Sequence, residues 1–163
     1  MAAYRADPGV ARYQGWEAAS VREVENFIRS LAELEPDSPG QWYQLGIALP
    51  DGRLIGDCGL HTLHRDPRQA EVGITVAPAH QRRGYGVEVL TAVLGLLFDR
   101  LGKHRVIASV DPRNHASVAL LQRVGMRLEA HHVEALWFKG AWADDLVFAM
   151  LRREWWDQAG NLR

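Results

Sequence analysis

Two arginines and two glycines form the part of the sequence best suited to holding a ligand. Arg82 and Arg83 precede Gly84 and Gly86, and an apolar helical pattern begins directly afterwards. Glycine lets a backbone approach a ligand without a Cβ atom in the way. The free N–H groups of a first helical turn, with the positive end of the helix dipole, make an anion site. A pyrophosphate suits this pattern, although two such glycines can also serve only a tight turn from strand to helix.

Two common nucleotide-binding motifs do not fit this loop. The P-loop requires a lysine directly after its second glycine, and no lysine lies near Gly86. The dinucleotide fingerprint requires a third glycine three residues after Gly86, where this chain has Val89. The loop therefore indicates an anion site of another kind.

The loop lies between a predicted strand and a predicted helix. Alternating Val72, Ile74 and Val76 indicate a strand over 69–76, and apolar steps of three and four indicate a helix over 87–101. Ser20 and Glu23 form a capping box for an earlier helix that we expect to reach Leu34. The other predicted elements are strands over 42–49, 53–63, 105–110, 127–138 and 142–151, and a helix over 114–124. This order predicts an α/β (α+β) fold with a mixed sheet, in one domain spanning residues 1–163.

Length and composition limit the class of protein. The 163 residues are 47% hydrophobic and 24% charged, which is typical of one globular domain. A formal net charge of −1 argues against a nucleic-acid partner. No apolar run approaches the roughly 20 residues that cross a bilayer, and the N-terminus lacks a signal sequence. A single cysteine, Cys58, favours a reducing compartment, so we expect a cytoplasmic protein without membrane contact.

Several motifs together resemble one enzyme family. The segment between the strand and the helix is Gln81-Arg82-Arg83-Gly84-Tyr85-Gly86. It resembles the coenzyme A loop, Gln/Arg-x-x-Gly-x-Gly/Ala, of the GCN5-related N-acetyltransferases. Residues 111–126 are similar to the Asp-Pro-x-Asn-x-x-Ser…Gly-Phe segment of the branch that acetylates the N-termini of ribosomal proteins. Residues 10–16 and 140–145 resemble that branch's early segment and closing hairpin, so the resemblance covers nearly the whole chain.

The resemblance implies acetyl-CoA as co-substrate and a mostly antiparallel sheet with a splayed central strand. Main-chain groups of Ile74 and Val76 would pair with pantetheine. Asn114 would hydrogen-bond the pantetheine arm, although asparagine is also a preferred N-cap and Ser117 lies three residues on. The pyrophosphate would be wrapped by the backbone amides of Arg82, Arg83, Gly84, Gly86 and Val87.

Transfer of an acetyl group to an amine requires a donor for the oxyanion, an acid for the thiolate and a neutral amine. The amide of Val76 would serve the oxyanion. Many family members use a tyrosine as the acid, but this chain has Gln122 and Arg123 at that place. Ser117 is the matching hydroxyl in the ribosomal-protein branch, and it becomes the expected acid. It could instead be an ordinary polar residue of a first helical turn.

The base is open between two carboxylates. The branch often has a glutamate at the position held here by Leu136, which is a departure. Glu134 lies two residues earlier and hence on the same strand face, and Glu71 near the start of its strand is the competitor. Either could be a surface carboxylate. A strong base is not essential, because a peptide α-amine has a pKa of about 7.7–8.0.

The seven histidines do not predict a metal site. His61 and His64 are three apart, which places them on opposite faces of a strand, and no cysteine or carboxylate cluster accompanies them. A histidine lining the acceptor cleft is the preferred interpretation.

The start of the chain is a second departure from the family. Members usually have a strand and a helix before the early segment, which begins here at Val10. Either the start is trimmed or the sheet lacks its usual first strand. An uncovered sheet edge would favour a homodimer. Trp155 and Trp156 would cover apolar surface or face a partner.

The sequence thus predicts an acetyl-CoA-dependent N-acetyltransferase acting on a primary amine in a ternary complex. A protein N-terminus is the first acceptor by resemblance, and a polyamine, amino acid or aminoglycoside is the second. A non-catalytic acetyl-CoA-binding module is the alternative of a different class.

Overall fold

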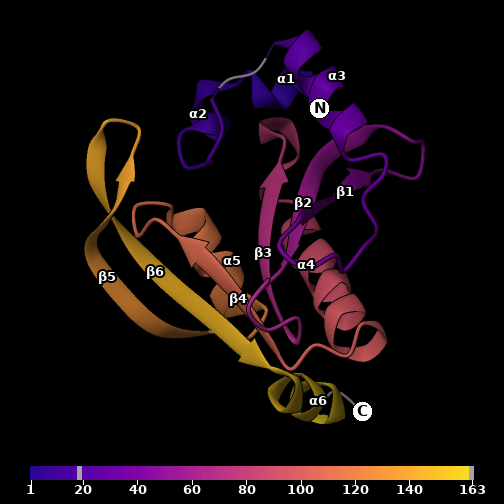
Figure 1. The fold of residues 1–163 in the computed structure, drawn as a ribbon, viewed down its shortest axis with the longest axis vertical. Coiled ribbons are helices and arrows are strands. Elements are labelled where there is room, and N and C mark those ends of the chain that lie inside the picture. Colours follow the sequence, from indigo (N-terminus) through magenta and orange to yellow (C-terminus); the bar gives the residue numbers. More distant parts are fainter. Residues whose placement is uncertain (18–19, 162–163) are drawn as a thin grey trace.

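A single six-stranded sheet organises the chain, which the computed structural model describes at residues 1–17 and 20–161 (Figure 1). The strands are β1 (Trp42–Ala48), β2 (Leu54–Thr62), β3 (Gln69–Val76), β4 (Arg105–Val110), β5 (Arg127–Phe138) and β6 (Ala141–Leu151). Their order in the sheet is β1-β2-β3-β4-β6-β5. Only the β3–β4 pair is parallel among the pairs in this sheet. The predicted mixed, mostly antiparallel sheet is confirmed.

The helices differ more from the prediction than the strands do. They are α1 (Ala2–Arg5), α2 (Pro8–Ala11), α3 (Val21–Ser30), α4 (Tyr85–Gly95), α5 (His115–Arg123) and α6 (Arg152–Asn161). The capping box of Ser20 and Glu23 is present, but α3 ends at Ser30 and does not reach Leu34. The helical period continues beyond α4 as a π-helical turn over Leu96–Arg100. The short α1 and α2, and α6 after the last strand, were not predicted.

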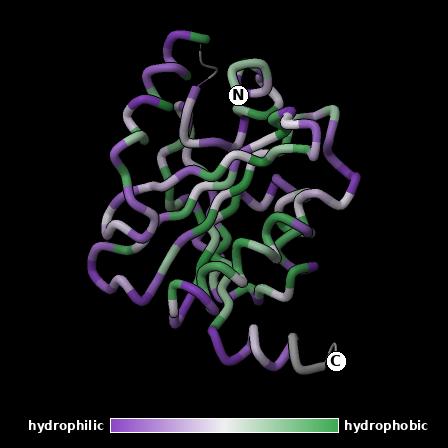
Figure 2. Tube along the Cα trace, turned by 90° about the vertical axis from the view of Figure 1, so that its right-hand side faces the viewer, coloured by the Kyte–Doolittle hydropathy of each residue, from purple (hydrophilic) through white to green (hydrophobic). Residues whose placement is uncertain are grey.

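Apolar side chains gather on one face of the sheet, where α4 and α5 pack. Leu60, Val72 and Val106 join residues of both helices in one buried cluster. Figure 2 shows these hydrophobic strands and α4 at the centre of the fold. Trp155 packs beside this cluster, with its ring stacked on Phe98, so it covers apolar surface.

The N-terminal helices lie against the opposite face. The buried carboxylate of Asp57 on β2 accepts hydrogen bonds from Tyr4 Oη at 3.1 Å and from Arg5 Nη2 at 2.6 Å. The Arg5 guanidinium also lies over the rings of Trp16 and Phe27, at 4.8 and 4.6 Å from their centroids. These contacts hold residues 1–17 over the sheet, above the place where β3 and β4 part (Figure 1).

The central parallel strands splay apart. Residues Gln69–Glu71 of β3 pair with Arg105–Ile107 of β4, and pairing stops there although β3 continues to Val76 and β4 to Val110. The two strands visibly diverge in Figure 1. The expected splayed central strand is confirmed, and it leaves a gap in the middle of the sheet.

Strand β1 forms one edge of the sheet. In the described ranges 1–17 and 20–41, the only β-type contact before it is an isolated bridge between Pro39 and Thr62. The edge-mediated homodimer stays a prediction. No helix in the described part of the chain has the length and apolar character needed to span a membrane.

Candidate active site

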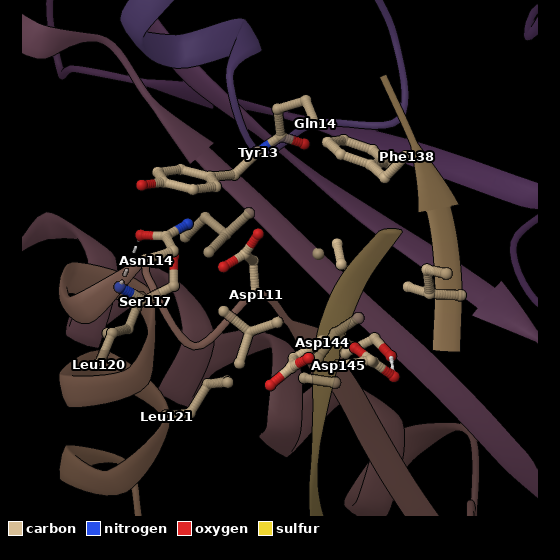
Figure 3. Close-up of a pocket in the computed structure, with 18 of the residues that line it drawn as sticks. Tyr13, Gln14, Asp111, Asn114, Ser117, Leu120, Leu121, Phe138, Asp144 and Asp145 are labelled. Carbon is tan, nitrogen blue, oxygen red and sulfur yellow. Dashed lines mark hydrogen bonds between the residues drawn. The ribbon is translucent and has the colours of Figure 1, made fainter. Parts of the chain in front are cut away.

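A cavity of about 210 Å³ fills the gap between β3 and β4 (Figure 3). Its walls come from β3, β4, α5, the β5–β6 hairpin and the N-terminal segment that carries Tyr13 and Gln14. Leu90 and Leu120 line it on the helical side of the sheet, and Tyr13 and Phe138 line it on the other. The cavity therefore connects the two faces of the sheet.

Backbone groups of β3 face this gap. Ala77 N donates to Ile55 O at 2.7 Å, and Leu63 N donates to Gln69 O at 3.0 Å, at the two ends of the β2–β3 ladder. Because antiparallel bonding alternates by residue, Ile74 and Val76 direct their N–H and C=O groups away from β2. Pairing with β4 has already ended at that level, and Ile74 lines the cavity, whereas Val76 lies beyond its lining residues. The carbonyl oxygen of Val76 accepts a hydrogen bond from the side-chain nitrogen of Gln81 at 2.9 Å.

The start of α4 carries amides without helical partners. Its first i→i−4 bond runs from Glu88 N to Gly84 O at 3.1 Å, so the N–H groups of Tyr85, Gly86 and Val87 precede it. Gly84 occupies the N-cap position and has no side chain to cap them. The arrangement is the anion site that the sequence predicts, since it joins free donors to the positive end of the helix dipole.

The two loop glycines serve different purposes. Gly84 has a φ of +88°, and a Cβ atom there would meet no heavy atom within 4 Å. Its backbone conformation, and not crowding, is what requires glycine. A Cβ atom on Gly86 would lie 3.3 Å from Leu120, so this glycine lets α4 approach α5 closely. The backbone of Arg82 is also in the left-handed region, with a φ of +59°.

The first turn of α5 places Asn114 and Ser117 in the cavity wall. Asn114 Oδ1 accepts from Ser117 N at 3.3 Å, which is the N-cap that the sequence allows. The amide nitrogen of Asn114 points away from this cap into the cavity (Figure 3). The cap leaves the hydroxyl of Ser117 uninvolved, because the bond uses its backbone.

Carboxylates line the cavity at Asp111, Asp144 and Asp145. Asp145 is 8% exposed and accepts from Ser109 Oγ at 2.9 Å. Hydrogen bonds from Arg113 hold the pKa of Asp111 below its ordinary value. Asp144 accepts from the backbone of Glu134 at 2.9 Å, and this bond with the neighbouring His131 holds the pKa of Asp144 low.

Glu71 lies at the point where β3 and β4 separate. Burial raises the pKa of its carboxyl above the ordinary value, and the nearby Asp145 acts in the same direction. His61 on β2 partly opposes the shift, with its Nδ1 3.7 Å from Glu71 Oε2. His61 is itself held by stacking on Trp42, at 5.0 Å between ring centroids.

The prediction that Glu134 shares a strand face with Leu136 is wrong. The register passes from His132↔Asp145 to Leu136↔Ala143, so β5 advances four residues while β6 advances two. Glu134 lies in the resulting bulge with a φ of +46° and an exposed side chain. Leu136 lines the cavity and Glu134 does not. The bulge breaks the two-residue alternation on which the prediction depends.

Sequence reasoning missed most of the acidic wall. Asp144 and Asp145 interrupt an otherwise apolar strand, a signal that could have indicated a cavity. Tyr13 carries no such signal, because a segment distant in sequence brings it to the site. Within residues 1–17 and 20–161, no three histidine, cysteine or carboxylate side chains are grouped as metal ligands.

The fold and the site define a class of protein. A splayed strand with unpaired backbone N–H groups leads into an uncapped helix N-terminus. The cavity beside them is lined by the carboxylates of Asp111, Asp144 and Asp145. This is the architecture of a GCN5-related acyltransferase.

Comparison with known proteins agrees with this class. Residues 1–127 match the family model described as an acetyltransferase (GNAT) domain. The chain is 32% identical over 146 residues to an uncharacterised N-acetyltransferase of Bacillus subtilis, covering 88% of this chain and 81% of the relative. It is 27% identical over 118 residues to the ribosomal protein uS5-alanine N-acetyltransferase of Escherichia coli, covering 71% and 61%.

A solved structure shares the fold. The spermidine N-acetyltransferase of Vibrio cholerae, in complex with CoA and spermine, superposes with a TM-score of 0.81 at 22% identity, covering 95% of this chain and 89% of that one. The chain belongs to the GNAT family of acetyltransferases, and it is an acetyl-CoA-dependent N-acetyltransferase.

Proposed function

We propose that the chain acetylates the α-amine of a peptide or protein N-terminus, by direct transfer in a ternary complex. The observation that carries this proposal is the cavity through the sheet, which lets an amine and a thioester approach from opposite faces. Both reactants are then held together, so a covalent acetyl-enzyme is not required.

The charges on the acidic face favour one amine over a polycation. Asp111 is already paired with Arg113, and Asp144 contacts His131 at 2.7 Å. Among the described residues, Asp145 is the cavity-lining carboxylate without an ion pair, and it is left to face an incoming ammonium group. A single α-amine matches this supply of charge better than a polyamine does, and one relative is named for an alanine of ribosomal protein uS5.

Coenzyme A fits the helical side of the cavity. The amides of Arg82, Arg83, Gly84, Gly86 and Val87 would surround the pyrophosphate at the start of α4. The main-chain groups of Ile74 and the N–H of Val76 would pair with the pantetheine arm, although Val76 O already accepts from Gln81, and Asn114 would donate its side-chain nitrogen. The bound molecule supplies the acetyl thioester.

Three chain groups would carry the transfer. The N–H of Val76 would donate to the thioester oxygen as negative charge develops there. Glu71 would accept the amine proton as the C–N bond forms, and burial makes its carboxylate a stronger base than an ordinary glutamate. Ser117 would donate its hydroxyl proton to the sulfur as the C–S bond breaks. Glu134 is the second candidate for the base, from outside the cavity.

The non-catalytic module that the sequence left open is set aside, because the chain is an N-acetyltransferase. A small amine is the alternative acceptor, and it is favoured by the spermidine enzyme that shares the fold. Thiol release from acetyl-CoA should be measured with N-terminal peptides, polyamines, amino acids and aminoglycosides. We expect the highest kcat/KM with a peptide. When both substrates are varied, the double-reciprocal plots of the initial rate should intersect, as a ternary complex requires. A higher kcat/KM for spermidine would contradict the peptide acceptor.

A further inference from the structure

A second hollow lies beside the acceptor end of the cavity. Its volume is about 390 Å³, and three cationic residues, Arg12, Arg113 and Lys139, line it together with Glu17. We call this feature the cationic hollow. Phe138 lines both the hollow and the cavity, so the two are adjacent at that side chain.

The cations are held in different ways. Lys139 donates to Ala11 O at 2.8 Å and to Trp16 O at 3.1 Å, which fixes its ammonium group at the edge of the hollow. It also lies 3.6 Å from the carboxylate of Glu17, a side chain that is 82% exposed. Lys139 thus joins the turn of the β5–β6 hairpin to the N-terminal segment and keeps part of its charge available.

Arg113 and Arg12 have donors to spare. Arg113 uses Nε and Nη2 on Asp111, which lines the cavity, and its side chain is 62% exposed. Arg12 lies over the ring of Tyr13 at 5.2 Å, and no carboxylate in residues 1–17 and 20–161 forms an ion pair with it. Tyr13 lines the cavity, so Arg12 is beside the acceptor path.

The two hollows together form a gradient of charge. Carboxylates line the cavity at Asp111, Asp144 and Asp145, and guanidinium and ammonium groups line the neighbouring cationic hollow. An acceptor that enters with its ammonium group first places that positive charge beside the carboxylates of the cavity. If it also carries a negative charge behind the amine, that charge lies beside the cations of the hollow. Planar guanidinium groups are suited to a carboxylate in such a position.

We propose that the cationic hollow binds a carboxylate carried by the same acceptor whose amine enters the cavity. This inference rests on the proposed function. The carboxylate has two sources, the acidic side chain of a residue that follows the N-terminus of a peptide, or the α-carboxylate of a free amino acid. The two sources can be distinguished by testing a peptide acceptor and a free amino acid separately.

The test compares matched acceptors. Two C-terminally amidated peptides begin with alanine and differ only in glutamate or glutamine at the second position. Free alanine and alaninamide form the second pair. We expect the wild-type kcat/KM to be about tenfold higher for the carboxylate-bearing member of one pair, mainly through KM, since one charge-assisted contact has about that effect.

Two variants locate the effect. Arg12→Gln should reduce the preference to less than about threefold, whereas Arg153→Gln removes the same charge on α6, at the far end of the molecule, and should leave it intact (Figure 1). The preference should also weaken as salt is raised from 0.05 to about 0.5 M, because this hollow is exposed to solvent.

The outcomes are distinct. Equal turnover of both members of each pair, or a preference that survives Arg12→Gln, overturns the cationic hollow as a subsite and leaves acetyl transfer standing. A complete lack of acetylation of every α-amine overturns the proposed function, and the subsite with it. A preference confined to the peptide pair identifies an acidic peptide as the source of the carboxylate, and one confined to alanine identifies an amino acid.

Discussion

At the scale of single residues, the hydroxyl of Ser117 can be separated from the helix that carries it. The cap of α5 uses the backbone N–H of Ser117 and the side chain of Asn114, so an alanine at 117 keeps the helix. If the hydroxyl protonates the leaving sulfur, Ser117→Ala should lower kcat by roughly 10²- to 10⁴-fold. Acetyl-CoA affinity, measured by calorimetry, should stay unchanged. A loss below threefold would return Ser117 to an ordinary helical residue.

Glu71 should reveal itself through the pH dependence of the reaction. Its raised pKa means that the carboxylate ionises at a higher pH than an ordinary glutamate, which titrates near about 4.3. Glu71→Gln should therefore depress kcat/KM most above the pKa of Glu71, where the wild-type carboxylate is ionised, and least at low pH, where it is already protonated. Glu134→Gln is the control and should keep the wild-type profile. The reverse pattern would assign the role of base to Glu134. If neither substitution changes the profile, the rise of kcat/KM with pH reports the ionisation of the amine itself.

The same substitution has an expected effect on stability, with the opposite sign. Between the unfolded and the raised folded pKa of Glu71, the folded state binds more protons, so its free energy of unfolding falls as pH rises. Glu71→Gln should raise the free energy of unfolding at neutral pH, and the gain should disappear below about pH 4. Urea unfolding at both pH values measures this. A less stable variant at neutral pH would show that the ion pair with His61 outweighs burial.

At the scale of elements, the start of α4 allows a matched pair of substitutions. Gly84→Ala and Gly84→Glu share the cost of a left-handed backbone, of order 1–2 kcal/mol, and neither meets a neighbouring atom at Cβ. Only the glutamate adds an anion where the amides should hold the pyrophosphate. We expect Gly84→Glu to weaken acetyl-CoA binding at least about tenfold more than Gly84→Ala does. Equal affinities in two folded variants would place the pyrophosphate elsewhere.

How far the sequence predicts the structure depends on the range of the interactions. Strands β3 and β4 and the cap at Asn114 follow from local periodicity and side-chain chemistry, and their boundaries agree with the prediction within a residue or two. The coenzyme side of the candidate site is built from these local elements, so the sequence alone could propose residues for it.

The acceptor side could not be predicted in the same way. Tyr13 reaches the cavity through contacts between distant segments, such as Tyr13 Oη with Arg113 O at 3.3 Å. Glu134 was misplaced because a bulge has no clear signature in one sequence, although the chain after it returns to regular pairing. The helices α1 and α2 have four residues each and are too short to show a period.

At the scale of the whole molecule, the gap in the sheet organises everything else. Helices α4 and α5 border it on one face, and the N-terminal segment, anchored by Arg5 on Asp57 and by Lys139, borders it on the other. The central claim is that coenzyme A occupies the helical side of this gap, between the free backbone of β3 and the amides of α4.

Amide hydrogen exchange of the intact protein, with and without saturating coenzyme A, tests this claim most directly. The amides of Ile74, Val76, Gly86 and Val87 lack strand or helix partners in the free chain, and binding should protect them. Strand β1 and helix α6 lie away from the gap and should exchange at the same rate in both states. Protection of residues 74–76 and 84–87 is the predicted result. Saturated binding that leaves those amides unprotected would contradict the account.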